Sequence, residues 1–179
     1  MADTAQGARD QGPLQRTDGN GDHRWFTEDV SVHLDAVYRY FARRAPAADV
    51  DDLTSDVFEV AWRRRSDVPR EFVLPWLYRT ASLTLSNFRR RVGATPLHLT
   101  REPSVPDHSD RIAARDELTR AMALLAPRDR EILLLNAWEG LDGAELGAAL
   151  GISRSGAQAA LSRARARLRA LYTKGHHHG

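Results

Sequence analysis

The sequence predicts an all-α protein made of two small helical domains joined by a flexible linker. Apolar residues recur at helical spacing in both halves of the chain, and no stretch shows the alternation of period two that strands require. Between the halves, residues 93–110 contain one glycine and three prolines, a composition that disfavours regular structure. The 179 residues are enough for two small domains.

The N-terminal domain is expected at residues 25–92, after a disordered leader at residues 1–24. The leader is rich in Gly, Asp, Gln and Thr, has no helical periodicity and lacks the apolar core of a signal peptide. The first helix should begin near Thr27. The residues expected to share one buried face of this helix are Val30, Leu34, Val37, Tyr38 and Phe41.

Two further helices are expected in this domain. The second should run from about Asp49 to Arg65, because acidic residues at its start and arginines at its end suit the helix dipole. After a loop at residues 66–74, Pro75 is expected at the first position of the third helix, where its missing N–H costs nothing. That helix should continue to about Arg91.

The C-terminal domain is expected at residues 111–173, followed by a tail at residues 174–179 whose histidine run looks like a tag remnant. Four helices are predicted in it. Pro127 should open the second helix. Asp142, with an acid three residues later, resembles a capping box for the third, and Ser153 can cap the fourth.

Residues 144–161 predict a helix-turn-helix motif. A short helix ends at Gly151, which supplies the left-handed backbone conformation that other residues resist, and a second helix follows. Gly147 and Ala157 are small, so the two helices can cross closely. In such motifs the second helix enters the major groove of DNA. An ordinary helical hairpin with surface arginines is the alternative at this point.

The charged residues are unevenly distributed, although the formal net charge is only +2. Residues 151–174 contain six basic side chains and no acidic one, a second basic cluster lies at residues 89–91, and acids gather at residues 49–59. This pattern favours nucleic acid as the partner of the basic segments and protein as the partner of the acidic one. Candidates for DNA contact on the last helix are Arg154, Ser155, Gln158, Ser162 and Arg163, with Arg165 and Arg167 able to reach flanking phosphates.

The residue types also exclude some kinds of chemistry. The sequence has no cysteine, which rules out disulfides, thiolate metal sites and cysteine catalysis. No set of Asp, Glu and His has the spacing of a metal site or a catalytic triad, so we expect neither an enzyme nor a cofactor. No apolar run approaches the roughly 18 residues that cross a bilayer, so we expect a cytoplasmic protein with no membrane contact of its own.

Two separate blocks of sequence resemble one known family. In the C-terminal half, residues 124–135 (LLAPRDREILLL), 138–153 (WEGLDGAELGAALGIS) and 161–168 (LSRARARL) resemble sigma region 4. In the N-terminal half, residues 51–58 (DDLTSDVF) resemble the polymerase-binding helix of sigma region 2, and residues 75–91 resemble the helix that meets the −10 promoter element. With no domain between the blocks, the chain resembles the minimal, extracytoplasmic-function (ECF) group of sigma-70 family sigma factors.

The resemblance implies specific partners. In this family, region 2 binds the clamp helices of the largest subunit of core RNA polymerase, and region 4 binds the flap of the second-largest subunit. Both regions bind promoter DNA, and an anti-sigma factor often holds members inactive. The residues matching the polymerase-binding positions are Asp52, Leu53, Asp56, Val57 and Phe58, and those matching or flanking the −10-binding positions are Trp76, Arg79, Asn87, Arg89, Arg90 and Arg91. The recognition-helix candidates would then read the −35 element.

The sequence departs from the family pattern at three positions. Leu83 stands where many members carry an asparagine seven residues after the tryptophan, so the −10 preference is expected to differ from that of common members. Gln158 and Ala160 stand where many members carry basic residues, which removes two possible contacts to the −35 element.

Two other interpretations remain at this point. A stand-alone helix-turn-helix regulator would use residues 25–92 as a sensing or dimerising domain. A metal-dependent enzyme would rely on the terminal histidines at residues 176–178. The region 2 match argues against the first, and the lack of any convincing ligand spacing argues against the second.

Overall fold

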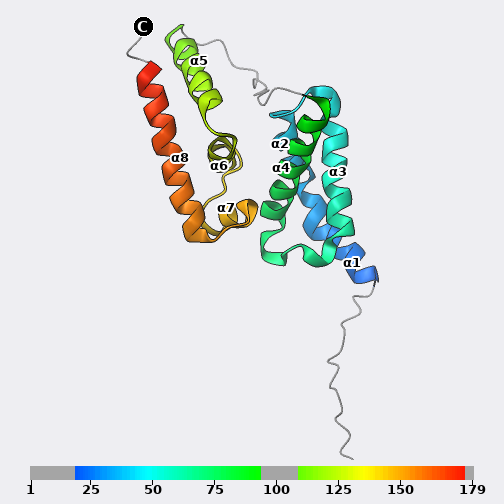
Figure 1. The fold of residues 1–179 in the computed structure, drawn as a ribbon. Helices are drawn as coiled ribbons and strands as arrows, with labels where there is room; N and C mark the ends of the chain where they lie inside the picture. The colour runs from blue at the N-terminus through cyan, green and yellow to red at the C-terminus, as the bar shows by residue number, and fades with distance from the viewer. Residues whose placement is uncertain (1–18, 94–108, 176–179) are drawn as a thin grey trace, which may run out of the picture.

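The computed structural model describes residues 19–93 and 109–175, and over these residues it is helical with no strand, as predicted (Figure 1). The predictions for residues 1–18, 94–108 and 176–179 lie outside the described residues. Helices α1 to α4 form an N-terminal lobe and α5 to α8 a C-terminal lobe. None of the described helices is both long and apolar enough to cross a bilayer.

The N-terminal lobe consists of α1 (Gly19–Trp25), α2 (Leu34–Ala42), α3 (Val50–Arg63) and α4 (Val73–Val92). Because α1 begins at Gly19, the prediction of a disordered leader was wrong for residues 19–24. The Asp22 carboxylate accepts a hydrogen bond from Nε of Arg65 at 2.7 Å, and Arg70 lies 3.8 Å above the buried ring of Trp25. These contacts tie α1 to the 3-10 turns that connect α3 to α4, which the sequence periodicity did not reveal.

The buried face of α2 also differs from the predicted one. Val37 and Phe41 are fully buried as expected, whereas Leu34 and Tyr38 are about half exposed, at 50% and 45%. A π-turn at residues 26–30 and a 3-10 turn at residues 31–33 precede α2, and both change the number of residues per turn. The helical register therefore rotates, and Tyr40 takes the buried position instead.

Helix α4 begins at Val73, two residues before the predicted start. Pro75 is still accommodated, because the amides of the first helical turn have no partner within the helix. The helix ends at Gly93, whose φ of 62° is the left-handed conformation that closes many helices. Helix α4 packs against both α2 and α3, so it is the central helix of this lobe (Figure 1).

The C-terminal lobe consists of α5 (Ser109–Leu124), α6 (Pro127–Ala137), α7 (Gly143–Leu150) and α8 (Arg154–Gly175). Pro127 opens α6 as predicted. The buried guanidinium of Arg130 donates to the carbonyls of Met122, Ala123 and Leu125 at 2.7 to 2.9 Å. Arg130 thereby satisfies carbonyls at the end of α5, which have no partner within their own helix.

The predicted helix-turn-helix is present as α7 and α8. Gly151 has a φ of 67°, as expected for the tight turn. A Cβ atom on Gly147 would lie 2.9 Å from the carbonyl oxygen of Ile152, so only glycine permits this close approach. Ser153 caps α8 by accepting a hydrogen bond from the amide of Gly156 at 3.1 Å. The capping box predicted at Asp142 is wrong, because its side chain makes no capping hydrogen bond.

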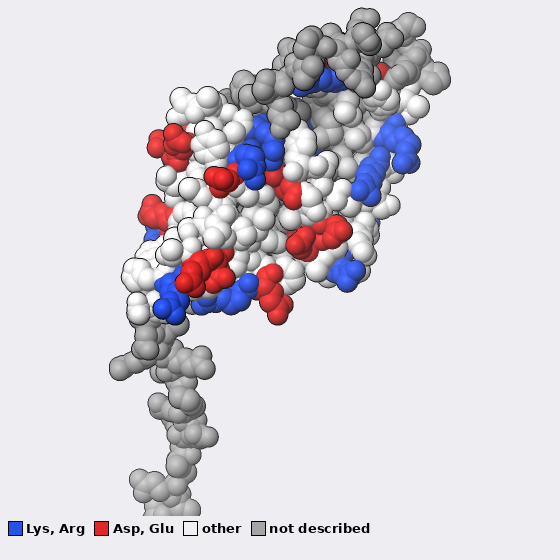
Figure 2. All heavy atoms as spheres, turned by 180° about the vertical axis from the view of Figure 1, so that it is seen from behind, with Lys and Arg blue, Asp and Glu red and all other residues white. Residues whose placement is uncertain are grey.

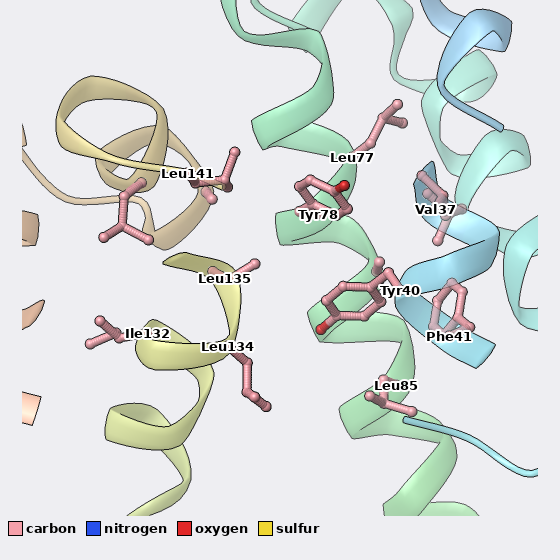
Figure 3. Close-up of a cluster of buried hydrophobic side chains, with 14 of the residues drawn as sticks. Val37, Tyr40, Phe41, Leu77, Tyr78, Leu85, Ile132, Leu134, Leu135 and Leu141 are labelled. Atoms are coloured by element: carbon pink, nitrogen blue, oxygen red, sulfur yellow. The ribbon is translucent and has the colours of Figure 1, made fainter. Parts of the chain in front are cut away.

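The two lobes pack against each other in this structure. Helices α2 and α4 of the N-terminal lobe face α6 and α7 of the C-terminal lobe (Figure 1). Figure 3 shows Tyr40, Tyr78 and Leu85 on one side of this interlobe interface, with Leu134 and Leu135 of α6 on the other. The sequence did not indicate how the two domains meet, so their packing is an additional finding.

Candidate functional site

The first half of α8 presents an exposed polar face directly after the tight turn. Arg154, Ser155, Gln158, Ser162 and Arg163 are all exposed. Ala157, Leu161 and Ala164 are buried on the opposite side, where α8 packs against the rest of the lobe. The structure therefore brings the five base-contact candidates together on one rigid helix, whose orientation is fixed by the motif core.

The two phosphate-contact candidates further along α8 are directed toward α6. Nη1 of Arg167 donates to both carboxylate oxygens of Asp129, at 2.8 and 2.7 Å. Nη2 of Arg165 donates to Oδ1 of Asn136 at 2.8 Å. In this conformation both guanidinium groups stabilise the contact between α6 and α8. Each would have to exchange a protein acceptor for a phosphate in order to bind DNA.

The polymerase-binding candidates on α3 differ in their exposure to solvent. Asp52 and Asp56 are exposed. Leu53 and Val57 are buried, at 2% and 0% exposure, so these two candidates offer no surface to a partner. Phe58 is half buried, and its ring meets that of Phe26 edge-on at 6.5 Å. The surface that α3 offers is therefore acidic, with one partly accessible aromatic ring beside it.

The −10 candidates on α4 do not share one face. Trp76 is half buried against the core, and its carbonyl accepts a hydrogen bond from Thr80. Asn87 and Arg91 line a groove of about 240 Å³ between α3 and α4, which Asp56 also lines. Nη2 of Arg90 donates a hydrogen bond to the amide oxygen of Asn87. An acidic polymerase-binding candidate and two −10 candidates thus lie next to each other.

The remaining basic residues of α4 face the C-terminal lobe. Arg79, Arg89 and Arg90 line a groove of about 830 Å³ between the lobes, together with Arg128 of α6. The guanidinium of Arg79 approaches Gly151 so closely that a Cβ there would lie 2.8 Å from it. Arg89 donates to the carbonyl of Arg44 at 2.9 Å, and burial lowers its pKa. Arg79 thus meets the C-terminal lobe, whereas the hydrogen bond of Arg89 lies within the N-terminal lobe.

A cluster that the sequence did not reveal lies at the centre of this interface. Glu139, in the turn after α6, accepts hydrogen bonds from Nη2 of Arg43 at 2.6 Å and from Nη1 of Arg44 at 2.9 Å. The side chains of Glu139 and Arg44 are 2% and 3% exposed. Both guanidinium groups also lie over the ring of Trp138, at 5.4 and 5.2 Å. We refer to Arg43, Arg44 and Glu139 as the Glu139 cluster.

Two tyrosines extend the cluster across the interface. The hydroxyl of Tyr40 donates to Oε1 of Glu131 at 2.8 Å. Burial raises the pKa of Tyr40 well above its ordinary value, and the charge of Glu131 raises it further. Burial and then the charge of Glu139 raise the pKa of Tyr78 to about 12. Both phenols are therefore neutral hydrogen-bond donors at physiological pH.

On the face of the molecule seen in Figure 2, basic and acidic side chains are interspersed, and no field of one sign covers it. Among the described residues, no group of three His, Asp or Glu side chains is arranged to hold a metal ion. The arrangement is suited to binding macromolecules through several separate surfaces. These surfaces are the exposed face of α8, the acidic side of α3 and the basic side of α4.

Comparison with known proteins gives consistent matches. A family model described as "Sigma-70, region 4" matches residues 115–168. RNA polymerase sigma factor NccH of Alcaligenes xylosoxydans xylosoxydans is 32% identical in an alignment 173 residues long, which covers 88% of this chain and 92% of that protein. RNA polymerase sigma factor CnrH of Cupriavidus metallidurans is 32% identical in an alignment 171 residues long, which covers 85% of this chain and 88% of that protein.

Solved structures agree with these sequence matches. A structure of CnrH in complex with the cytosolic domain of CnrY is similar with a TM-score of 0.52 and 27% identity, covering 88% of this chain and 90% of that one. The sigma factor RpoE in complex with the anti-sigma factor NepR, from Bartonella quintana, shares the fold with a TM-score of 0.58 at 20% identity, over 83% and 96% of the two chains.

Proposed function

Because the chain belongs to the ECF sigma factors of the sigma-70 family, we propose that it binds core RNA polymerase and directs it to promoters with −35 and −10 elements. The observation that carries this proposal is the exposed face of α8, which is presented by a tight turn of the kind that places a helix in the major groove. The polymerase supplies the catalysis, and this chain supplies recognition. The site of action is the cytoplasm, where polymerase and chromosome meet.

The −35 element would be read by α8. Arg163 can form paired hydrogen bonds with guanine and Gln158 with adenine, while Arg154, Ser155 and Ser162 lie on the same face. Arg165 and Arg167 would contribute phosphate contacts after release from α6. Because Gln158 and Ala160 stand where many family members carry basic residues, backbone contacts and DNA shape are expected to carry a large share of the affinity.

The N-terminal lobe would bind polymerase through α3 and the −10 strand through α4. Asp52 and Asp56 are exposed and available to a basic partner, and the half-buried Phe58 lies on another side of α3, where it packs on Phe26. Leu53 and Val57 act indirectly, because they anchor α3 in the core. Trp76, Arg79 and Asn87 would hold unstacked bases of the melted strand, with Arg89, Arg90 and Arg91 on its backbone.

An anti-sigma factor would control the chain. The support is that the similar chain CnrH has been solved in complex with the cytosolic domain of another protein, CnrY. Recovery of such a partner with the chain from the native cell would support this part of the proposal. Its absence from cells in which the regulated genes are silent would refute it.

The proposal is tested by run-off transcription. Core polymerase, genomic fragments and the purified chain are combined, and start sites are mapped. We expect start sites that appear only when both proteins are present, with a common pair of elements upstream. Arg163→Ala should reduce output at these sites, whereas Arg120→Ala, an exposed arginine on α5, should not. Equal output from core polymerase alone would contradict the proposal, and specific DNA binding without any effect on polymerase would favour a stand-alone regulator.

A further inference from the structure

The connection between α3 and α4 has little regular structure of its own. It spans residues 64–72 and contains two short 3-10 turns, Arg65–Asp67 and Arg70–Phe72. Single turns of this kind are weak, so contacts from outside the connection must fix its position. The connection enters α4 at Val73, and the −10 candidate Trp76 lies in the first turn of that helix. Whatever holds the connection therefore also helps to place Trp76.

Asp22 of α1 holds one end of the 64–72 connection through Arg65. Nε of Arg65 donates to the Asp22 carboxylate at 2.7 Å, and the Asp22 side chain is only 11% exposed. The same guanidinium donates through Nη1 to the carbonyl of Trp62 at 3.2 Å and lies 4.9 Å from the centre of the Trp62 ring. Arg65 is therefore fixed between α1 and the end of α3.

Trp25 of α1 holds the other end of the connection through Arg70. The guanidinium of Arg70 lies 3.8 Å from the centre of the Trp25 ring, which is within the range of a cation–π interaction. Trp25 itself is anchored in the core at 7% exposure. Between the two arginines, Val68 is buried at 4% exposure. The connection is thus fixed at three points, and two of them are side chains of α1.

We propose that Asp22 and Trp25 are positioning residues for −10 recognition, which hold the 64–72 connection where it and Trp76 can accommodate an unstacked base. This inference rests on the proposed function. A nearly buried carboxylate is unsuited to contact with phosphates, so Asp22 acts on DNA only through Arg65. Binding sites need their walls placed within about 0.5 Å, so a loosened connection should lose base selectivity while the lobe stays folded.

The test measures base selectivity with the complete holoenzyme. Promoters mapped by run-off transcription are altered at single −10 positions and, separately, at single −35 positions. With the parent chain, a wrong base at the most selective −10 position should lower output about tenfold. Asp22→Asn should reduce this −10 factor to about threefold and leave the −35 factor unchanged. Asp22→Glu, which keeps the carboxylate, should restore the parental −10 factor.

Two further variants connect the effect to the contact between Asp22 and Arg65. Glu28→Gln removes an acid from the exposed ion pair with Arg24, and it should keep the parental −10 factor. Arg65→Gln removes the partner of Asp22, so it should reproduce the loss of selectivity. The double variant should lose no more than either single variant. Should Asp22→Asn fail to fold, Arg65→Gln takes its place, because the Arg65 side chain is 39% exposed.

Arg70 provides an independent check on the contact with Trp25. Arg70→Gln removes the cation from the Trp25 ring and should lower the −10 factor in the same way as Asp22→Asn. Arg63→Gln removes the same charge at the end of α3, where the side chain is 63% exposed, and should leave the factor unchanged. Equal losses in these two variants would show that Arg70 acts by charge alone and would overturn the role of Trp25.

The outcomes separate this inference from the proposed function. A parental −10 factor in both Asp22→Asn and Arg65→Gln would overturn the inference. An equal loss at −10 and −35 positions would also overturn it, because that result indicates general destabilisation. Failure of the proposed function gives a different result, since the parent chain would then yield no start sites with core polymerase, or start sites indifferent to the −10 sequence.

Discussion

Nη1 of Arg167 in α8 donates to both carboxylate oxygens of Asp129 in α6, at 2.8 and 2.7 Å, whereas Arg163, one helical turn earlier on the same side of α8, is exposed beyond the reach of this ion pair. Two arginines one turn apart on the same helix thus have different surroundings. This difference separates their expected contributions to DNA binding and to stability.

We therefore predict different results for Arg163→Ala and Arg167→Ala. Arg163→Ala should weaken binding to a −35 duplex by about 1 to 3 kcal/mol if it pairs with a base, with no loss of stability. Arg167→Ala should lower the free energy of unfolding by up to about 1 kcal/mol, because Arg167 forms a partly exposed ion pair with Asp129. Duplex titrations at several salt concentrations, together with urea unfolding, provide the check. Identical binding losses for the two variants would contradict this assignment.

Arg130 should be a stability determinant of the C-terminal lobe. Its guanidinium donates hydrogen bonds to three carbonyls near the end of α5. Arg130→Ala leaves these buried acceptors without donors, so it should lower the free energy of unfolding by about 2 to 4 kcal/mol. The neighbouring Arg128 is exposed, and Arg128→Ala should change stability by less than about 0.5 kcal/mol. Thermal unfolding of both variants measures the difference, and comparable melting temperatures would show that the capping role is wrong.

Gly147 should tolerate no side chain. A methyl group there would collide with the backbone carbonyl of Ile152, which cannot move without opening the turn. Gly147→Ala should therefore destabilise the motif by about 1 to 3 kcal/mol and weaken DNA binding through displacement of α8. Ala159→Ser, at an exposed position on α8, is the control and should leave stability nearly unchanged. A variant at Gly147 with parental stability would show that the two helices can move apart freely.

High pH should weaken the interlobe interface. Tyr78 has a folded-state pKa of about 12, raised from the ordinary 10.0 mainly by burial, so the folded chain favours its neutral form. The resulting stabilisation is complete below about pH 10 and is lost as the pH rises from 10 to 12. A difference of this size between the pKa values of the folded and unfolded states corresponds to roughly 3 kcal/mol in the free energy of unfolding.

The measurement for this prediction is unfolding free energy against pH, with Tyr78→Phe as the test variant. Removing the phenol should make the decline between pH 10 and 12 shallower but should not abolish it, because burial raises the pKa of Tyr40 as well. Tyr38→Phe, at a half-exposed site on α2, is the control and should keep the parental slope. A decline that persists unchanged in Tyr78→Phe would assign the pH dependence to another group.

The sequence predicted those parts of the fold that depend on neighbours along the chain. The tight turn at Gly151, the cap at Ser153 and the start of α6 at Pro127 all follow from residues within a few positions of one another. The exposed face of α8 follows from the same local pattern. Leu34 and Tyr38 were wrongly placed in the core, because the periodicity assumed a regular helix where π and 3-10 turns intervene.

Contacts between distant residues could not be predicted in this way. Glu139 lies 96 and 95 positions from Arg43 and Arg44, and nothing in either local sequence indicates the other. Asp22 and Arg65 are 43 positions apart, so the ion pair that fixes α1 had no sequence signal. With a single sequence, the separation into two domains was evident, but the way in which they meet was not.

The composition of the interlobe interface has a consequence for solubility. Its larger groups include Tyr40, Tyr78 and Arg44, which combine apolar area with polar ends and are compatible with hydration once uncovered. Helix α7 adds the small residue Ala149 next to Leu150. Leu85, Leu134 and Leu135 lie in the same interface, so lobes that part would expose an apolar strip bordered by these amphipathic side chains. The packing of the lobes therefore covers apolar area that would otherwise promote aggregation.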